Sequence, residues 1–522
     1  MAVQLTVFDG SGCIGGNKIY LLADGVGVFF DFGLNFSARS RYFDEFLRPR
    51  SALGLLDYLK TGLLPPIPGI YRHDLFPPGA KRMEGFGLKE DDPLQLQAVL
   101  LSHAHSDHLQ MISFLQPHIP IYSSLASAVI AKARQDTGSG NLDGETTSII
   151  PKEEWEGLLR SSHYRTSPAL GRIFKVAEGQ IAGQVQEFWA TPPSARALQC
   201  IPLESYSGQV GNLNTLYFPV DHSIPGSGAW AVETSEGWVV YTGDLRLHGA
   251  RKGDTLHFVA QAARLRPLAL ICEGTHLDNE WFMSEAAVYE NARLAVELSK
   301  GLVIADFSLS NMERLALFYQ VALDTGRILV VTFKDAYLLE ALSQVIPDMP
   351  SIENSSQLKI YGPNKVNLAS WERALAERYS ARMVPAQEIQ KAQAAFILCF
   401  GYYDLPNLLD IEPRGGLYLH SSSEPFHEQM ILDMGRLQAW LDHFQIHNAG
   451  HLLQKPKPSP FHSSGHIGGH ELLHLIEQIR PRFLIPVHTE KPHRIRQMVQ
   501  ARLGKAVNVI LPKTGHTFSL KG

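Results

Sequence analysis

Short hydrophobic runs separated by glycine-rich turns dominate the first third of the chain. The segment KIYLLADGVGVFFDFG (18–33) has two such runs around an Asp-Gly turn, which predicts a β-hairpin. DPLQLQAVLLSH (92–103) begins with alternation and ends in an apolar run, which predicts a strand that becomes buried. DHLQMISFLQ (107–116) predicts a short helix, and the segments 234–244 and 267–276 predict strands that end in polar residues.

The pattern changes near residue 296, where predicted strands begin to alternate with predicted helices. GLVIADF (301–307) is followed by the helical pattern SLSNMERLALFYQVAL (308–323) and by the strand RILVVTF (327–333). Alternation of this kind is typical of an α/β unit with a parallel sheet, and it continues to about residue 447. The last 75 residues return to helix, strand, helix and strand.

Length and composition fit a globular protein with more than one core. The chain has 522 residues, too many for one small core, so two domains are expected. Its 45% hydrophobic and 19% charged residues are ordinary for a globular protein. The net charge of −5 gives no global attraction for nucleic acid, so a nucleic-acid partner would need a local basic channel.

The cysteines and the apolar runs bear on compartment and membrane attachment. The four cysteines are far apart and form no pair motif, which favours a reducing compartment and a cytoplasmic location. The opening MAVQLTVFDG predicts no signal peptide. No apolar run approaches the ~20 residues of a membrane helix, so no membrane association is expected.

The segment SHAHSDH (102–108) is the strongest candidate for a metal site. It places His103, His105, Asp107 and His108 within six residues, directly after a predicted strand. The pattern H-x-H-x-D-H should arise by accident in roughly one such chain in several hundred. A tight loop at a strand end can direct the first two histidines at one cation and the last two residues at a neighbouring one. The alternative is a histidine-rich loop that is merely solvated.

A second motif, HELLH (470–474), points to a different enzyme class. It matches the H-E-x-x-H helix of zinc peptidases, with Glu471 as general base. Chance alone should produce this shorter pattern in roughly one such chain in twenty. The extended peptidase pattern needs Gly and His where this chain has Glu477 and Arg480. The zinc peptidase is therefore kept only as a minor alternative.

One loop cannot close two metal sites, and three residues at other predicted strand ends could complete them. His222 lies in a turn, Asp244 ends the strand GWVVY, and His488 ends the strand RFLIPV. Each alone could be a capped or buried polar residue. Together with the SHAHSDH residues they supply enough ligands for two cations, and Asp244 could bridge them.

These residues carry a resemblance to the metallo-β-lactamase fold and, beyond it, to the β-CASP nucleases, among them the ribonuclease J family. The matching segments, in chain order, are FFDFGLNF, SHAHSDH, VDHSIPGSGAWAVETSEGWVVYTGDLRLHG, CEGTHL, ADFSLSNMER, HSSSEPF, SSGHIGGHE and IPVHTE. The resemblance implies an α/β fold: a metallo-β-lactamase αββα sandwich (1–295 and 448–522) with an inserted β-CASP α/β domain (296–447). As a departure from the family, we expect its extra C-terminal domain to be absent, because the chain ends soon after IPVHTE.

The resemblance further implies a dinuclear metal centre. One ion would be held by His103, His105 and His222, the other by Asp107, His108 and His488, with Asp244 between them. Two zinc ions suit the imidazole-rich set, although the carboxylates also admit manganese. Asp31, in FFDFGLNF, is expected behind the ligands.

Catalytic and substrate-binding roles follow from the same resemblance. Glu273 falls at motif A and His466 at motif B, where His466 would approach the scissile phosphate or protonate the leaving oxygen and Glu273 would orient it. Asp107 and Asp244 belong to the catalytic set as metal ligands. The residues expected to bind the substrate phosphates are Ser308, Ser422, Ser463 and Ser464, with plain helix caps as the alternative.

We therefore predict a dinuclear-metal ribonuclease that hydrolyses single-stranded RNA as a 5′-exonuclease, an endonuclease or both. His488 lies at motif C, where the RNA-acting members carry histidine and the DNA-repair branch resembling Artemis carries valine. The alternatives are a DNA nuclease of the same fold and a catalytically silent RNA-processing scaffold. A homodimer is left open.

Three segments depart from the ribonuclease J pattern. QDTGSGNLDGETTS (135–148) predicts an exposed loop or insertion. RSSHYRTS (160–167) is basic and aromatic and is either a solvated face or a contact to nucleic acid. RSRYFDEFLRPR (39–50) is expanded relative to the family.

Overall fold

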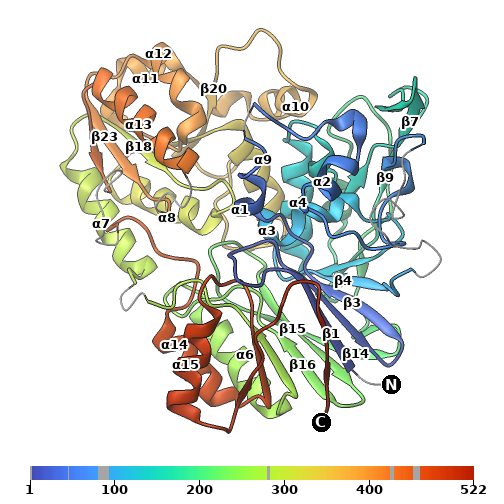
Figure 1. Ribbon diagram of the computed structural model, residues 1–522. Helices are drawn as coiled ribbons and strands as arrows, with labels where there is room; N and C mark the ends of the chain where they lie inside the picture. Colours follow the sequence, from blue (N-terminus) through green and yellow to red (C-terminus); the bar gives the residue numbers. More distant parts are fainter. Residues whose placement is uncertain (1–2, 45, 80–92, 279–281, 424–427, 451–458) are drawn as a thin grey trace.

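The computed structural model describes residues 3–44, 46–79, 93–278, 282–423, 428–450 and 459–522. Its strands form three large sheets, one of eight strands and two of seven. The first two sheets pack face to face, and the third lies beside them at the upper left of Figure 1. The end of the predicted HSSSEPF segment, residues 424–426, lies outside the described residues.

The first sheet contains the predicted hairpin and the strand that leads into SHAHSDH. Asp24 and Gly25 have φ values of 50° and 82°, the two positive values that a type I′ turn requires. The strands, in spatial order, are β12 (Glu204–Ser205), β10 (Phe174–Val176), β5 (Ile121–Ser123), β4 (Ala98–Leu100), β3 (Val26–Phe30), β2 (Lys18–Ala23), β1 (Val3–Asp9) and β27 (Thr517–Leu520). Because β27 pairs with β1, both ends of the chain lie at the same edge of this sheet (Figure 1).

The second sheet faces the first across a hydrophobic core. Phe30 of the first sheet and Trp230 and Ile271 of the second are fully buried in this core. The strands, in order, are β13 (Gln209–Val210), β14 (Leu213–Pro219), β15 (Gly228–Thr234), β16 (Gly237–Tyr241), β17 (Ala269–Cys272), β25 (Phe483–Pro486) and β26 (Asn508–Val509).

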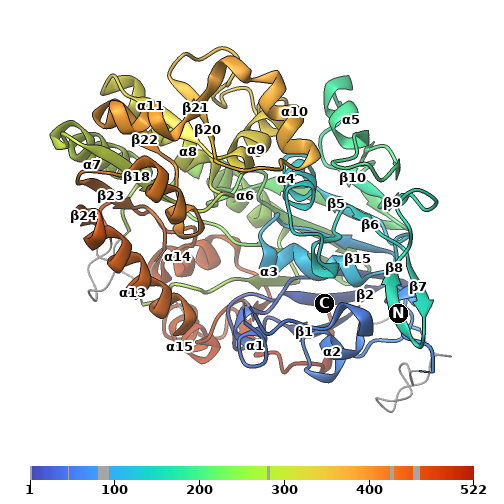
Figure 2. The same ribbon diagram turned by 90° about the horizontal axis from the view of Figure 1, so that it is seen from above.

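Helices cover the outer face of each of these two sheets, which completes the αββα sandwich. On the second sheet, Phe258, Leu475 and Val499 pack into one buried cluster. The helices there are α6 (Lys252–Leu265), α14 (Gly469–Ile479) and α15 (Pro492–Leu503). Those on the side of the first sheet are α1 (Phe36–Arg39), α2 (Leu56–Lys60), α3 (Ser106–Leu109), α4 (Leu125–Asp136) and α5 (Gly183–Ala190), as Figures 1 and 2 show.

The third sheet is entirely parallel and has helices on both faces, as parallel sheets normally do. Its strands, in order, are β21 (Met383–Pro385), β20 (Leu358–Gly362), β19 (Ile328–Val331), β22 (Phe396–Leu398), β18 (Leu302–Asp306), β23 (Gly416–His420) and β24 (Ile446–Ala449). Its helices are α7 (Glu285–Leu298), α8 (Met312–Asp324), α9 (Phe333–Ser343), α10 (Ser370–Arg378), α11 (Ala386–Lys391), α12 (Leu408–Ile411) and α13 (Glu428–His443).

The predicted fold class, a sandwich with an inserted α/β unit, is confirmed. The boundaries at 295/296 and 447/448 stay a prediction, and β24 extends two residues past the second of them. Among the described residues, no helix is long and apolar enough to cross a membrane.

The prediction of an exposed loop at 135–148 is mostly wrong. Helix α4 continues to Asp136, and only residues 138–141 are exposed. Asp143 is buried and forms an ion pair with Arg39. Glu145 is buried against Arg72 at 2.6 Å, so this polar composition reflects internal ion pairs rather than solvent contact. The remaining short strands lie nearby: β6 (Ser148–Ile149), β7 (Lys152–Trp155), β8 (Leu158–Ser161), β9 (Ala169–Gly171) and β11 (Leu198–Gln199).

Two other predicted segments differ in detail. The helix expected over 107–116 is α3 followed by a 3₁₀ turn over Gln110–Phe114. The basic segment 160–167 begins in the hairpin β7–β8, where Arg160 lies 3.7 Å from the ring of Trp155. This hairpin lies on the opposite side of the molecule from β23 and β24 (Figures 1 and 2).

A glycine beside the SHAHSDH loop permits a close backbone contact. A Cβ atom on Gly33 would lie 1.7 Å from the carbonyl oxygen of Asp107. We expect Gly33→Ala to displace this loop and to lower the free energy of unfolding by about 2 kcal/mol in chemical denaturation. Gly435→Ala is the matched control, because Gly435 lies in helix α13 with no atom within 4 Å of an added Cβ. That change should stabilise the protein by up to about 1 kcal/mol, and equal losses for both variants would contradict the expectation.

Candidate metal centre

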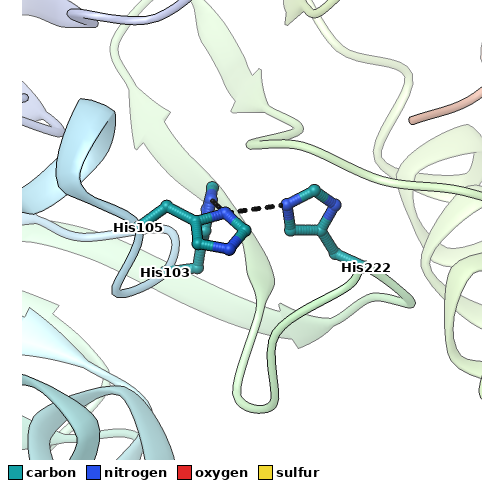
Figure 3. A group of neighbouring side chains, drawn as sticks. All are labelled: His103, His105 and His222. Atoms are coloured by element: carbon teal, nitrogen blue, oxygen red, sulfur yellow. Dashed lines mark hydrogen bonds between the residues drawn. The ribbon is translucent and has the colours of Figure 1, made fainter. Parts of the chain in front are cut away.

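The first group of candidate ligands consists of His103, His105 and His222. The first two lie in the loop between β4 and α3, and the third follows β14. Their rings point toward one another (Figure 3), with His105 Nδ1 lying 3.1 Å from His103 Nε2 and 3.2 Å from His222 Nε2. These separations are close to the ~3.3 Å between nitrogens that share a tetrahedral zinc ion. The geometry therefore fits one cation.

Burial prepares these imidazoles for metal binding. Burial, reinforced by neighbouring imidazoles, lowers the pKa of His103 and His222 well below the usual value and that of His105 to about 4. The rings are therefore neutral near pH 7, as metal ligands must be. His222 Nδ1 donates to the Gly465 carbonyl at 2.5 Å, which leaves Nε2 free to coordinate.

The second group brings Asp107 and His108 of the same loop together with His488, which follows β25. His488 Nε2 lies 3.2 Å from Asp107 Oδ2, and His108 Nε2 lies 3.7 Å from the same oxygen. Thr275 Oγ1 donates to Glu273 at 2.7 Å, so it accepts from His488 Nδ1 at 2.9 Å. This bond directs His488 Nε2 toward the other two candidate ligands.

Asp244 lies between the two groups. Its Oδ2 atom is 3.1 Å from His108 Nε2 and 3.7 Å from His488 Nε2 in one group. The same oxygen is 3.8 Å from His103 Nε2 and 3.9 Å from His222 Nε2 in the other. Its Oδ1 atom is buried and accepts no hydrogen bond from the described part of the chain. Burying a carboxylate oxygen without a partner costs free energy, and bound cations would remove that cost. The donors on both sides of Asp244 therefore fit a pair of cations.

Asp31 lies behind the candidate ligand His108. It is fully buried and has a φ of 57°, and its Oδ2 atom accepts from His108 Nδ1 at 2.7 Å. Further donors are the backbone N–H and the hydroxyl of Ser102, both at 2.7 Å, and the hydroxyl of Tyr241 at 2.6 Å. These contacts fix the His108 ring with Nε2 toward Asp244, in line with the predicted position of Asp31.

We expect Asp31→Asn to weaken metal binding by about 10- to 100-fold, because the His108 ring loses its carboxylate acceptor. Asn tolerates the left-handed backbone that Asp31 adopts. The measurement is competition for Zn²⁺ against a chelating dye. Asp24→Asn is the control, since Asp24 has a φ of 50° in a surface turn. Identical Zn²⁺ affinities for the two variants would contradict this role of Asp31.

His466 and Glu273 lie beside Asp244. His466 Nδ1 is 3.0 Å from Glu273 Oε2 and 3.8 Å from Asp244 Oδ2. Burial alone would lower the pKa of His466, but the charges of Glu273 and Asp244 and the bond to Glu273 raise it to about 9. The backbone N–H of Leu245 donates to Glu273 Oε1 at 2.9 Å and holds this carboxylate in place. The pair can therefore present a protonated imidazole near neutral pH.

The four predicted serines lie in two places. Ser463 and Ser464 precede His466; Ser463 Oγ is buried without a hydrogen-bond partner in the described chain, and Ser464 Oγ accepts from the His466 N–H at 3.1 Å. Ser308 and Ser422 follow the adjacent parallel strands β18 and β23, so they share one sheet edge. Asn311, not Ser308, caps helix α8, which removes the plain-cap alternative for Ser308. The phosphate-binding roles stay predictions.

HELLH takes no part in the candidate centre. His470 and His474 are exposed on helix α14, and neither belongs to a ligand cluster among the described residues. The buried residues of this helix are Gly469, Leu472, Leu475, Ile476 and Ile479, and Leu473 is half-buried. The helix is amphipathic, with its histidines on the solvent side.

Several residues that shape the centre have no recognisable signal in the sequence. Ser102, Tyr241, Thr275 and Gly465 contribute a hydroxyl or a carbonyl that fixes a ligand or its neighbours. Each lies within three residues of a predicted site residue, which is the only indication that the sequence offers.

Comparison with known proteins finds similarity to metal-dependent hydrolases and ribonucleases. Residues 459–512, which include His466 and His488, match the family described as a Zn-dependent metallo-hydrolase RNA specificity domain, which implies a metal cofactor. Ribonuclease J of Mycolicibacterium smegmatis is 23% identical over 440 residues, 83% of this chain and 65% of that protein. Ribonuclease J 1 of Streptococcus pyogenes is 21% identical over 430 residues, 80% of this chain and 62% of that protein.

A solved structure shares the fold. A protein of unknown function from Enterococcus faecalis has a TM-score of 0.66 and 21% identity, with all of both chains covered. The present chain spans only about two thirds of the length of the two ribonucleases, 65% and 62%. The predicted resemblance to the β-CASP nucleases, and to ribonuclease J among them, is confirmed.

Proposed function

We propose that this ribonuclease J-like chain is a dinuclear-metal ribonuclease that hydrolyses phosphodiester bonds of single-stranded RNA. The observation that carries the proposal is the position of Asp244 Oδ2, within 3.9 Å of ligand atoms in both groups. Ions of adjacent sites that share a carboxylate are typical of phosphodiester hydrolysis. We assign zinc to both sites, with manganese as the substitute that the carboxylates would accept.

The residues divide the chemical work. His103, His105 and His222 would hold one ion, and Asp107, His108 and His488 the other, with Asp244 between them. When bound, the two ions would supply water activation at neutral pH and neutralisation of phosphate charge. His466 donates a proton to the leaving oxygen, and Glu273 holds its ring and stabilises its protonated form.

RNA is favoured over DNA by the C-terminal part of the chain. The RNA-specificity match at 459–512 contains His466 and His488. Ser463 and Ser464 lie in the same match, and the unpartnered Ser463 hydroxyl is a donor that could bind a phosphate oxygen. We propose that Ser308 and Ser422 bind a second phosphate from the edge of the third sheet, and that residues 296–447 act as the inserted domain.

Cleavage of matched 5′-phosphorylated single-stranded RNA and DNA tests the proposal. The metal-loaded chain should cut RNA and leave DNA intact, and the product ladder separates exonuclease from endonuclease action. Comparable cutting of DNA would contradict the preference attributed to His488. Metal binding without cutting of either strand would instead indicate a scaffold.

A further inference from the structure

Arg246 follows Asp244 by two residues and contacts four distant segments of the chain. Its side chain is fully buried, with Nε 2.9 Å from Asp221 Oδ1. One terminal nitrogen lies 2.9 Å from Glu285 Oε1 and 3.2 Å from the Ser464 carbonyl oxygen. The other lies 2.9 Å from Glu313 Oε2. One guanidinium therefore connects the turn before His222, the segment before His466, and helices α7 and α8.

Backbone hydrogen bonds reinforce the ion pair between Arg246 and Asp221. The Arg246 N–H donates to the Asp221 carbonyl at 2.8 Å, and the Asp221 N–H donates to Thr255 Oγ1 at 2.9 Å. A Cβ on Gly249 would lie 2.4 Å from Arg246 Nε, so the chain folds tightly around this pair. The neighbours His222 and Asp244 are thereby held in a fixed relation across the two ligand groups.

The segment before His466 is held at two consecutive carbonyls. The Ser464 carbonyl accepts from Arg246 and from His248 Nε2, the latter at 2.8 Å. The Gly465 carbonyl accepts from His222 Nδ1 at 2.5 Å. The backbone of this segment therefore depends on Arg246 and His248 on one side and on a candidate metal ligand on the other.

Glu285 and Glu313 connect Arg246 to helices α7 and α8 beside the third sheet. Glu285 begins α7 and also accepts from Arg314 of α8 at 2.8 Å. Arg314 in turn donates to the Phe461 carbonyl at 2.7 Å, upstream of His466. A buried ion network of this kind is weak evidence for stability, since replacing the whole network by apolar residues is often neutral, whereas removing one partner is costly. The positions that this network fixes explain it better: it holds the segment before His466 against helices α7 and α8.

We infer that Arg246 is a positioning residue, which fixes the Ser463–His466 segment and helices α7 and α8 against the metal centre. The inference rests on the proposed function, because the consequence for turnover presupposes RNA hydrolysis. Displacement of a reacting group by about 1 Å can cost about a hundredfold in rate. Arg246 thus acts through His466 and the ligand turn rather than on the substrate itself.

The test compares Arg246→Met and Arg246→Lys with Arg327→Met in metal-loaded protein. Arg327 is a matched control, since it is also buried and donates to the Val296 carbonyl at the far end of α7 and to the Gly301 carbonyl just beyond that helix. Arg246→Met should keep KM within about threefold while kcat falls about a hundredfold, with bound metal measured in the same samples. Arg246→Lys should recover about a tenth of the lost activity or more, and Arg327→Met should stay within about twofold of the wild type.

Hydrogen–deuterium exchange gives a second readout that does not depend on activity. Amides of residues 463–467 should exchange about tenfold faster in Arg246→Met than in the wild type and Arg327→Met. If the wild type cuts no RNA, the proposed function fails, but this exchange difference still decides the role of Arg246. Wild-type kcat together with unchanged exchange in Arg246→Met would overturn the inference.

A second variant covers the case in which Arg246→Met does not fold. His248→Phe removes one of the two side-chain donors to the Ser464 carbonyl and retains a ring against Phe282, which stacks on His248 at 4.6 Å. It should lower kcat about tenfold and accelerate exchange in the same segment. No change in either quantity would contradict the inference.

Discussion

Replacement of Asp244 by Asn is expected to abolish RNA cleavage, with kcat lowered by about a thousandfold or more, equivalent to about 4 kcal/mol of barrier. The reason is the shared oxygen: Asp244 Oδ2 faces both ligand groups, and the neutral amide removes the negative charge between the two cations. Bound metal should fall in the same variant. Cleavage assays and elemental analysis of the purified protein measure the two effects.

Glu471→Gln is the control for Asp244→Asn. Glu471 belongs to the H-E-x-x-H motif but lies outside every ligand cluster among the described residues. The Glu471→Gln variant should keep its metal content and its turnover within about twofold of the wild type. If Glu471→Gln lost activity while Asp244→Asn stayed active, the catalytic role assigned to Asp244 would be wrong. The H-E-x-x-H motif would then be the candidate catalytic site.

Replacement of His466 by Gln is expected to lower kcat by about 10²- to 10⁴-fold while both metals stay bound. His466 Nδ1 contacts Glu273 Oε2 at 3.0 Å, and the positive charge of the imidazolium disappears with the ring. Among the described residues, His466 falls in one possible ligand cluster, with Asp244, Glu273 and His488, but it belongs to neither of the two groups assigned to the cations, so metal content should change little. Single-turnover cleavage with metal analysis separates this effect from that of Asp244→Asn.

A histidine from the same part of the chain serves as the comparison for His466→Gln. His474 is exposed on helix α14, and within the described chain its ring bonds to Gln478 and lies near Glu477 of the same helix. His474→Gln should cleave RNA at the wild-type rate. Loss of metal in His466→Gln would show that His466 is a metal ligand, and its assignment as a proton donor would then be wrong.

The local elements were predictable because each has a short-range physical cause. The Asp24–Gly25 turn supplies two positive φ values, and strands β18 (LVIAD) and β19 (ILVV) of the third sheet are apolar runs between helices. SHAHSDH was recognisable because its ligands lie close together in the chain. The pairing of Asp107 with His488, 381 residues away, is a tertiary contact that followed only from the family resemblance.

Other features depend on tertiary contacts that the sequence does not display. The segment 135–148 has the composition of a solvated loop, yet Glu145 is buried because Arg72 neutralises it. Arg246 resembles any polar residue after a strand, and its four contacts are made by segments as much as 218 residues away. The role of Thr275 depends on a hydroxyl that sits between Glu273 and His488.

The central claim is that two metal ions in this centre support RNA hydrolysis. The most direct measurement is stepwise addition of Zn²⁺ to metal-free protein, with bound metal and RNA cleavage followed in the same samples. We expect cleavage to be absent without metal and to reach its plateau at about two ions per chain. Full cleavage by the metal-free protein, or a plateau at one ion per chain, would contradict the dinuclear mechanism.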